Sequence, residues 1–271
     1  MNAQWFDNYS IAELFLGSVA IMIAFIEIGF RFGSRTSGKA VKLQAAQVRA
    51  IMGASLGLAA FMLAFTFAIS QSHYELRVQN MVEEARLVRN AFLQAEFMNQ
   101  HDRLEARRLL RRYIQDRIQI EALTRQHKAG EVQALVKQSE EIQSELWQLA
   151  VASERKTNGQ DNTLQERQHF VGLVTGLIDI HAQRLQAALM NRISGVIWTV
   201  LYLTSVLSML IMGFQAGLTG RRSPIATWSL AIAFSVVMML ITDLDRPFMS
   251  LFRVDNEIMV YVLGQLDLNS L

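Results

Sequence analysis

The sequence predicts an all-α, multi-pass membrane protein with four transmembrane helices and a long extramembrane helical domain between the second and the third. Hydrophobic residues make up 51% of the 271 residues and charged residues only 18%, which is too apolar for an ordinary soluble domain of this length. Four apolar stretches approach or reach the ~20 helical residues that a bilayer core requires. Between the second and third of them lies a proline-free segment whose apolar residues recur at helical spacing.

The first transmembrane hairpin occupies residues 1–70, with spans at about 11–32 and 50–70. Span one contains Glu27, and a carboxylate inside a bilayer is costly unless it faces inward or has a partner. Arg31 follows four residues later on the same helix face, so the sequence predicts a structural ion pair between Glu27 and Arg31. A proton-relay or ion-site role for Glu27 is the alternative.

Span two carries Gly53, Gly57, Phe61, Phe65 and Ile69 at four-residue steps. Such steps keep side chains near one helix face, with a drift of about 40° at each step. The two glycines have the GxxxG spacing that favours close packing of membrane helices. The three bulky side chains can face lipid and neighbouring helices. In a ring of several copies they can instead form a hydrophobic constriction that controls the passage of ions.

The extramembrane segment, residues 71–192, is expected to fold as a bundle of four long helices. The breaks between them are expected near 99–102, 128–131 and 156–163. The first helix continues from span two, and the last leads into span three.

Six arginines lie between residues 103 and 117 of this segment. They form either a solvated helix face interleaved with acidic residues or a vestibule that concentrates anions in front of a pore. Nucleic acid is not an expected partner, because aromatic side chains do not alternate with these arginines and the domain is acidic elsewhere.

The second transmembrane hairpin occupies residues 193–246, with spans at about 193–214 and 225–242, and a C-terminal tail follows at 247–271. Pro224 stands where span four begins, and proline suits the first position of a helix because its missing N–H would have no helical partner there. Span four should therefore start sharply.

Four carboxylates follow the apolar part of span four: Asp243, Asp245, Asp255 and Glu257. Calcium takes about six to eight oxygen ligands, so two short acidic patches could hold it only when folded together with carbonyl groups and water. Alternatively, Arg246 and Arg253 pair with the carboxylates and form an ion-pair hinge at the membrane interface. The residues fit either arrangement.

Catalytic motifs are not recognisable in the chain. It contains no cysteine, and its five histidines show no metal-binding spacing. A Ser/His/Asp arrangement, a glycine-rich phosphate loop and paired carboxylates at a pocket are equally lacking in the sequence. We therefore expect a protein that is not an enzyme, and calcium at the acidic cluster is the one cofactor that these residues leave open.

The charges of the two short connections predict the orientation. Residues 31–49 and 215–224 carry basic residues and no acidic ones. Because basic loops stay on the cytoplasmic side, both connections should face the cytoplasm, with the termini and the helical domain outside.

Three stretches carry a resemblance to a known family: GLAAFMLAFTFAISQSHYELRVQNMVEEARLVRNAF at 57–92, RRLLRRYIQDR at 107–117 and DLDRPFMSLFRV at 243–254. With the order of spans and helical domain, they resemble the bestrophin-like domain family of bacterial membrane proteins, distant relatives of the bestrophin anion channels. The resemblance covers most of the chain.

The resemblance implies a homopentameric ion channel, with chloride among the inorganic ions it conducts, in the inner membrane of a bacterium. Span two would line the pore, and Phe61, Phe65 and Ile69 match the family's narrow point. The acidic cluster after span four would bind calcium. Bestrophins place the helical domain in the cytosol, so the resemblance and the loop charges imply opposite orientations.

Two functions therefore follow from the sequence. One is an oligomeric ion channel, because four spans of a single chain cannot enclose a wide pore. The other is a non-conducting membrane scaffold or sensor whose helical domain binds a partner.

Overall fold

The computed structural model describes residues 9–36, 41–126, 128–155, 161–189, 192–220, 223–246 and 257–268. Within these ranges the regular structure is entirely helical, which confirms the all-α prediction. The chain divides into two compact units. The membrane unit comprises Met1–Tyr74 and Asn191–Phe252, and the extramembrane unit comprises Glu75–Met190 and Arg253–Leu271.

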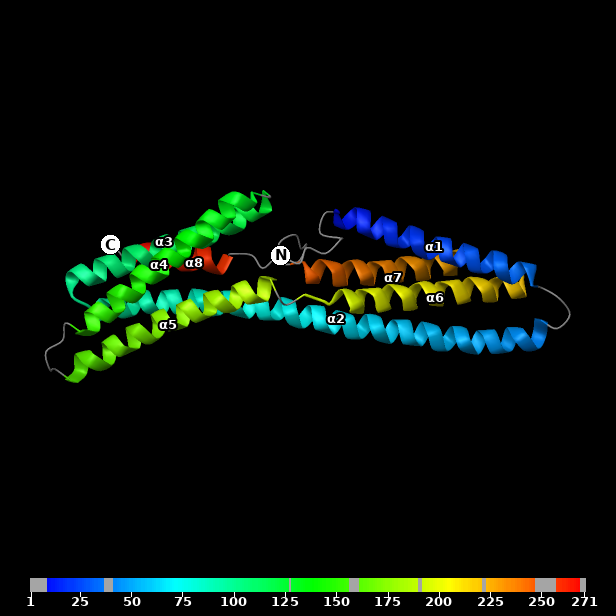
Figure 1. The fold of residues 1–271 in the computed structure, drawn as a ribbon, viewed down its shortest axis with the longest axis horizontal. Coiled ribbons are helices and arrows are strands. Elements are labelled where there is room, and N and C mark those ends of the chain that lie inside the picture. The colour runs from blue at the N-terminus through cyan, green and yellow to red at the C-terminus, as the bar shows by residue number, and fades with distance from the viewer. Residues whose placement is uncertain are drawn as a thin grey trace. The chain divides into compact units, whose positions relative to one another are not determined.

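The membrane unit contains α1 (Ile11–Arg35), the first part of α2 (Val41–Gln94), α6 (Gly195–Thr219) and α7 (Pro224–Asp245) (Figure 1). All four helices are long and apolar enough to cross a membrane, which confirms the four predicted spans. Helix α2 is uninterrupted over 54 residues because neither proline of the chain falls within it.

Polar residues define where these helices begin. At α1, the Glu13 N–H donates to Ser10 Oγ (3.2 Å) and the Ser10 N–H donates to the Glu13 carboxylate (2.7 Å). This capping box accounts for an acidic residue at the edge of span one. Ser194 caps α6, and α7 begins at Pro224 as predicted. Since α5 ends at Leu189, the fourth helix of the bundle does not run directly into α6.

Helices α1 and α6 approach each other through glycines at Gly29, Gly33, Gly213 and Gly217. A Cβ atom added at Gly213 would overlap the carbonyl oxygen of Ile26, and one at Gly29 would overlap that of Leu210. The two backbones therefore touch, which maximises van der Waals contact where no hydrophobic effect drives helices together.

Helix α2 is joined to α6 and α7 by serine hydroxyls. Ser208 Oγ donates to the carbonyl oxygen of Ser55 (2.9 Å), and Ser70 Oγ donates to that of Ile241 (3.1 Å). Both bonds run from a side chain to the backbone of another helix. They hold span two to the hairpin at two levels, and apolar packing of buried residues such as Leu63 and Met238 fills the space between.

The extramembrane unit contains the end of α2, the short 3₁₀ helix η2 (Ala95–Phe97), α3 (Gln100–Arg125), α4 (Ala129–Arg155), α5 (Asp161–Leu189) and α8 (Glu257–Leu268). The helix ends agree with the predicted breaks, and α5 begins at Asp161, inside the break expected at 156–163. Helix α3 starts at the predicted break, where Asn99 accepts a hydrogen bond from the Asp102 N–H.

The sequence analysis missed α8. Its Met259, Val262 and Leu266 are buried in the core of the extramembrane unit with Phe92 and Tyr113. Their spacing of three and four residues is that of an amphipathic helix. Helix α8 is thus part of the bundle.

Candidate functional site

The face of α2 that carries the predicted constriction is open in the single chain. Phe61 is 65% exposed and Phe65 is 53% exposed. Their rings stack, with centroids 6.4 Å apart and planes 14° from parallel. Ile69 is half-buried and packs against the core of the membrane unit. The helical drift at each step explains why the third residue turns inward from the first two.

Glycines extend this face towards the start of α2. A Cβ atom at Gly53 or Gly57 would have no neighbouring atom within 4 Å, and both residues are exposed. The predicted close packing at this GxxxG pair is therefore not made within the described chain. Within the membrane unit, the close approach of two helices is made by the glycines of α1 and α6. The α2 face combines small residues at one level with two stacked aromatic rings at the next.

The ion pair in span one has the predicted partners. Arg31 Nε lies 3.0 Å from Glu27 Oε1. The Glu27 side chain is 40% exposed and that of Arg31 is 72% exposed, so the pair lies on the surface of the unit near the end of α1.

At the exit of α7, Asp245 is fully buried. Its Oδ1 accepts the backbone N–H of Ile193 (2.8 Å), and its Oδ2 lies 3.8 Å from Arg192 Nε. Asp245 thus joins the end of span four to the residues that precede span three. These partners lie about fifty positions away in sequence, and the sequence analysis did not identify them.

Arg246 and Asp243 are also buried, at 3% and 1% exposure. Arg246 Nη1 donates to the carbonyl oxygen of Tyr9 (3.0 Å), which ties the entry of span one to the exit of span four. An arginine thus joins two segments of the membrane unit here, through a hydrogen bond to a backbone carbonyl.

Of the four predicted calcium ligands, only Asp243 and Asp245 belong to the described part of the membrane unit. Asp255 lies outside the described residues, as does Arg253, while Glu257 begins α8 in the extramembrane unit. Among the residues that the structure describes, no three acidic or histidine side chains gather as a metal site would require. Calcium binding by Asp243, Asp245, Asp255 and Glu257 stays a prediction.

Several arginines of α3 form ion pairs with acidic residues. Arg103 and Arg107 both bind Glu96, at 2.7 and 2.6 Å, and Arg108 binds Glu105 at 2.5 Å. Such pairing of arginines with acidic side chains is what the first alternative, a solvated helix face interleaved with acidic residues, describes.

A buried polar cluster that the sequence did not reveal lies in the extramembrane unit. Glu84 of α2 is fully buried. Its carboxylate accepts the hydroxyl of Tyr113 (2.5 Å) and forms ion pairs with Arg117 (3.2 Å) and Arg184. Gln143 of α4 donates to the Tyr113 oxygen (3.3 Å). Burial raises the pKa of the Tyr113 hydroxyl, which keeps it protonated as a donor. The carboxylate therefore connects α2, α3 and α5, and Gln143 adds α4 to the cluster through Tyr113.

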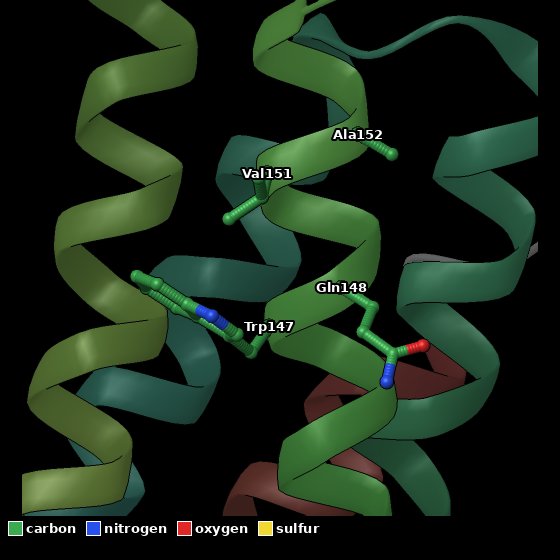
Figure 2. A pocket seen from close by; sticks show the side chains of 4 residues that line it. All are labelled: Trp147, Gln148, Val151 and Ala152. Carbon is green, nitrogen blue, oxygen red and sulfur yellow. The ribbon is translucent and has the colours of Figure 1, made fainter.

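The surface of α4 carries a shallow, open hollow. Figure 2 shows its lining residues Trp147, Gln148, Val151 and Ala152, all from this one helix. The Trp147 side chain is 40% exposed. None of the four is a titratable group, so the hollow lacks the convergent polar groups of a catalytic pocket.

Comparisons with known proteins agree with this architecture. A family model described as "Bestrophin-like domain" matches residues 14–259. A mutant of a bacterial bestrophin homologue from Klebsiella pneumoniae has a similar structure, with 13% identity, a TM-score of 0.51 and coverage of 97% of this chain and 100% of that one. A second crystal structure, of a mutant membrane protein, has 13% identity, a TM-score of 0.52 and coverage of 94% and 97%. No curated protein matches the sequence.

Proposed function

Because the chain belongs to the Bestrophin-like domain family, we propose that it is an ion channel built from several copies, with α2 around a shared axis. The observation that carries this proposal is the open α2 face, on which Phe61 and Phe65 stack and remain exposed in the single chain. The rings of several copies would form the hydrophobic constriction. Ile69 would complete it at the end nearest the core of the membrane unit.

The remaining features of the proposal concern assembly and location. The family resemblance favours a homopentamer in the inner membrane of a bacterium, and chloride as one of its inorganic ions. The exposed Gly53 and Gly57 would let neighbouring copies approach closely beside the constriction. The basic connections favour short loops in the cytoplasm and a helical domain outside. A reporter enzyme fused to the C-terminus should then be active only beyond the cytoplasm, and activity inside would reverse this orientation.

The substitution Phe65→Ala is expected to raise the conductance of the purified protein in planar bilayers several-fold. Removing a ring of aromatic side chains widens the constriction and allows it to stay hydrated. Leu203→Ala is the matched control, since Leu203 is a comparably exposed (56%) apolar residue on α6 and should leave the conductance unchanged.

Three outcomes count against the channel. The first is a bilayer that stays sealed with both the wild type and Phe65→Ala. The second is an equal rise in conductance for the Leu203 variant. The third is a solubilised particle with the mass of a single chain.

A scaffold or sensor is the second candidate, and the hollow beside the exposed Trp147 of α4 favours it (Figure 2). A partner segment could bury this indole and gain specific contact energy. This function predicts a dimer or mixed stoichiometry and no conductance, so the mass of the detergent-solubilised particle separates it from the ring.

Regulation by calcium at the exit of α7 is tested by melting the protein with calcium and with a chelator. We expect equal melting curves, because Arg192 already stands beside the Asp245 carboxylate.

We also expect Asp245→Asn to lower the free energy of unfolding by about 2 kcal/mol through loss of charge-assisted hydrogen bonding. The control Asp267→Asn removes a carboxylate that is 64% exposed and should change little. A calcium-dependent rise in Tm that Asp245→Asn abolishes would instead establish the cation site.

A further inference from the structure

His181 of α5 lies beside the Glu84 cluster and takes no part in its hydrogen bonds. It is only 7% exposed, and neither ring nitrogen has a hydrogen-bond partner in the described part of the chain. Arg184, one turn further along the same helix, binds the Glu84 carboxylate. A buried imidazole without a partner is costly to keep, and packing against apolar neighbours would be better served by an apolar side chain.

The groups of the cluster favour a neutral ring. Glu84 comes from α2, Tyr113 and Arg117 from α3, and Arg184 from α5, while α4 contributes the neutral Gln143. The cluster already holds two guanidinium groups. Burial lowers the pKa of Arg184 to about 10, which leaves it charged at neutral and acidic pH. A protonated His181 would bring a third positive charge into this interior.

We propose that His181 makes the Glu84 cluster a proton-operated latch, in which α5 stays docked on α2 through the Arg184–Glu84 ion pair while the imidazole is neutral, and opens when the ring takes up a proton. The inference concerns the extramembrane unit alone and is independent of ion conduction.

The direction of the effect follows from proton linkage. Burial, and secondly the charge of Arg117, lower the pKa of His181 from 6.5 to about 4. The opened state has the ordinary pKa and binds more protons, so acidification favours opening. The stability associated with the neutral ring is fully present above about pH 6.5, falls progressively towards pH 4 and is lost below it. Between about pH 7 and pH 5 the opening equilibrium should rise about 20-fold.

Hydrogen exchange of the full-length protein in detergent micelles tests this latch. Amides of α5 around His181 should exchange about 20-fold faster at pH 5 than at pH 7, after correction for the intrinsic exchange rate. In His181→Gln, which cannot take up the proton, this acceleration should shrink by the same factor. The matched control is His169→Gln, because His169 is an exposed residue of the same helix and its replacement should leave the acceleration unchanged.

Exchange of the imidazole C2 proton in the wild type needs no variant and stands even if His181→Gln fails to fold. The His181 midpoint should lie near 4, well below the ordinary 6.5. A midpoint near 6.5 overturns the latch. So does an acid acceleration of α5 exchange that is equal in the wild type and in His181→Gln.

Discussion

Gly213→Ala is expected to destabilise the membrane unit by about 3 kcal/mol or more. The new methyl group would overlap the carbonyl oxygen of Ile26 in α1. Because that obstacle is backbone, no side-chain rotation can relieve it, and α1 and α6 would have to move apart. The separation would also weaken the contacts at Gly29, Gly33 and Gly217. Thermal unfolding in detergent measures the change.

Gly17→Ala is the control for this substitution. Gly17 lies in α1, and a Cβ atom there would meet nothing within 4 Å. Its replacement should change the free energy of unfolding by no more than about 0.5 kcal/mol. If both alanine variants melted alike, the close backbone contact between α1 and α6 would not contribute to stability.

Glu84→Gln is expected to cost about 3–5 kcal/mol in the extramembrane unit. The substitution replaces the fully buried negative carboxylate by a neutral amide. The guanidinium groups of Arg117 and Arg184 thereby lose their shared ionic partner. Removing one partner of a buried ion pair strands the other, which is why the effect is large.

The neighbouring residue supplies the matched variant. Glu83 binds Arg86 at 2.5 Å, and both side chains are substantially exposed (41% and 55%). Glu83→Gln should therefore cost less than about 1 kcal/mol. Melting curves of the two variants, recorded on the full chain, should differ by several degrees. Equal curves would contradict the role of Glu84 as the shared partner of Arg117 and Arg184.

Much of the fold could be predicted because it depends on local properties. Apolar length identified the four spans, and Pro224 and the polar breaks marked the ends of helices. Helix α8 was missed because its 12 residues are short and follow a charged segment, so its apolar spacing was not distinguished from a tail. Its Met259, Val262 and Leu266 carried the signal nonetheless.

The polar junctions could not be predicted, because their partners are distant in sequence. Glu84 and Arg184 are 100 positions apart, and Arg246 and Tyr9 are 237 positions apart. The GxxxG spacing indicates that glycines pack membrane helices closely, but the spacing alone does not tell which pair makes the contact. Within the four spans it occurs at residues 29–33, 53–57 and 213–217, and among these pairs only the first and last bring two helices of the described chain together. Choosing among them requires the three-dimensional arrangement.

The glycine contact between α1 and α6 also indicates where the membrane unit should tolerate substitution. A few glycines set the distance between the two helices. The lipid-facing surface, in contrast, only needs to remain apolar. Random exchange among Leu, Ile, Val, Phe and Met there costs little. We therefore expect apolar exchanges on this surface to be tolerated far better than a substitution at Gly29 or Gly213.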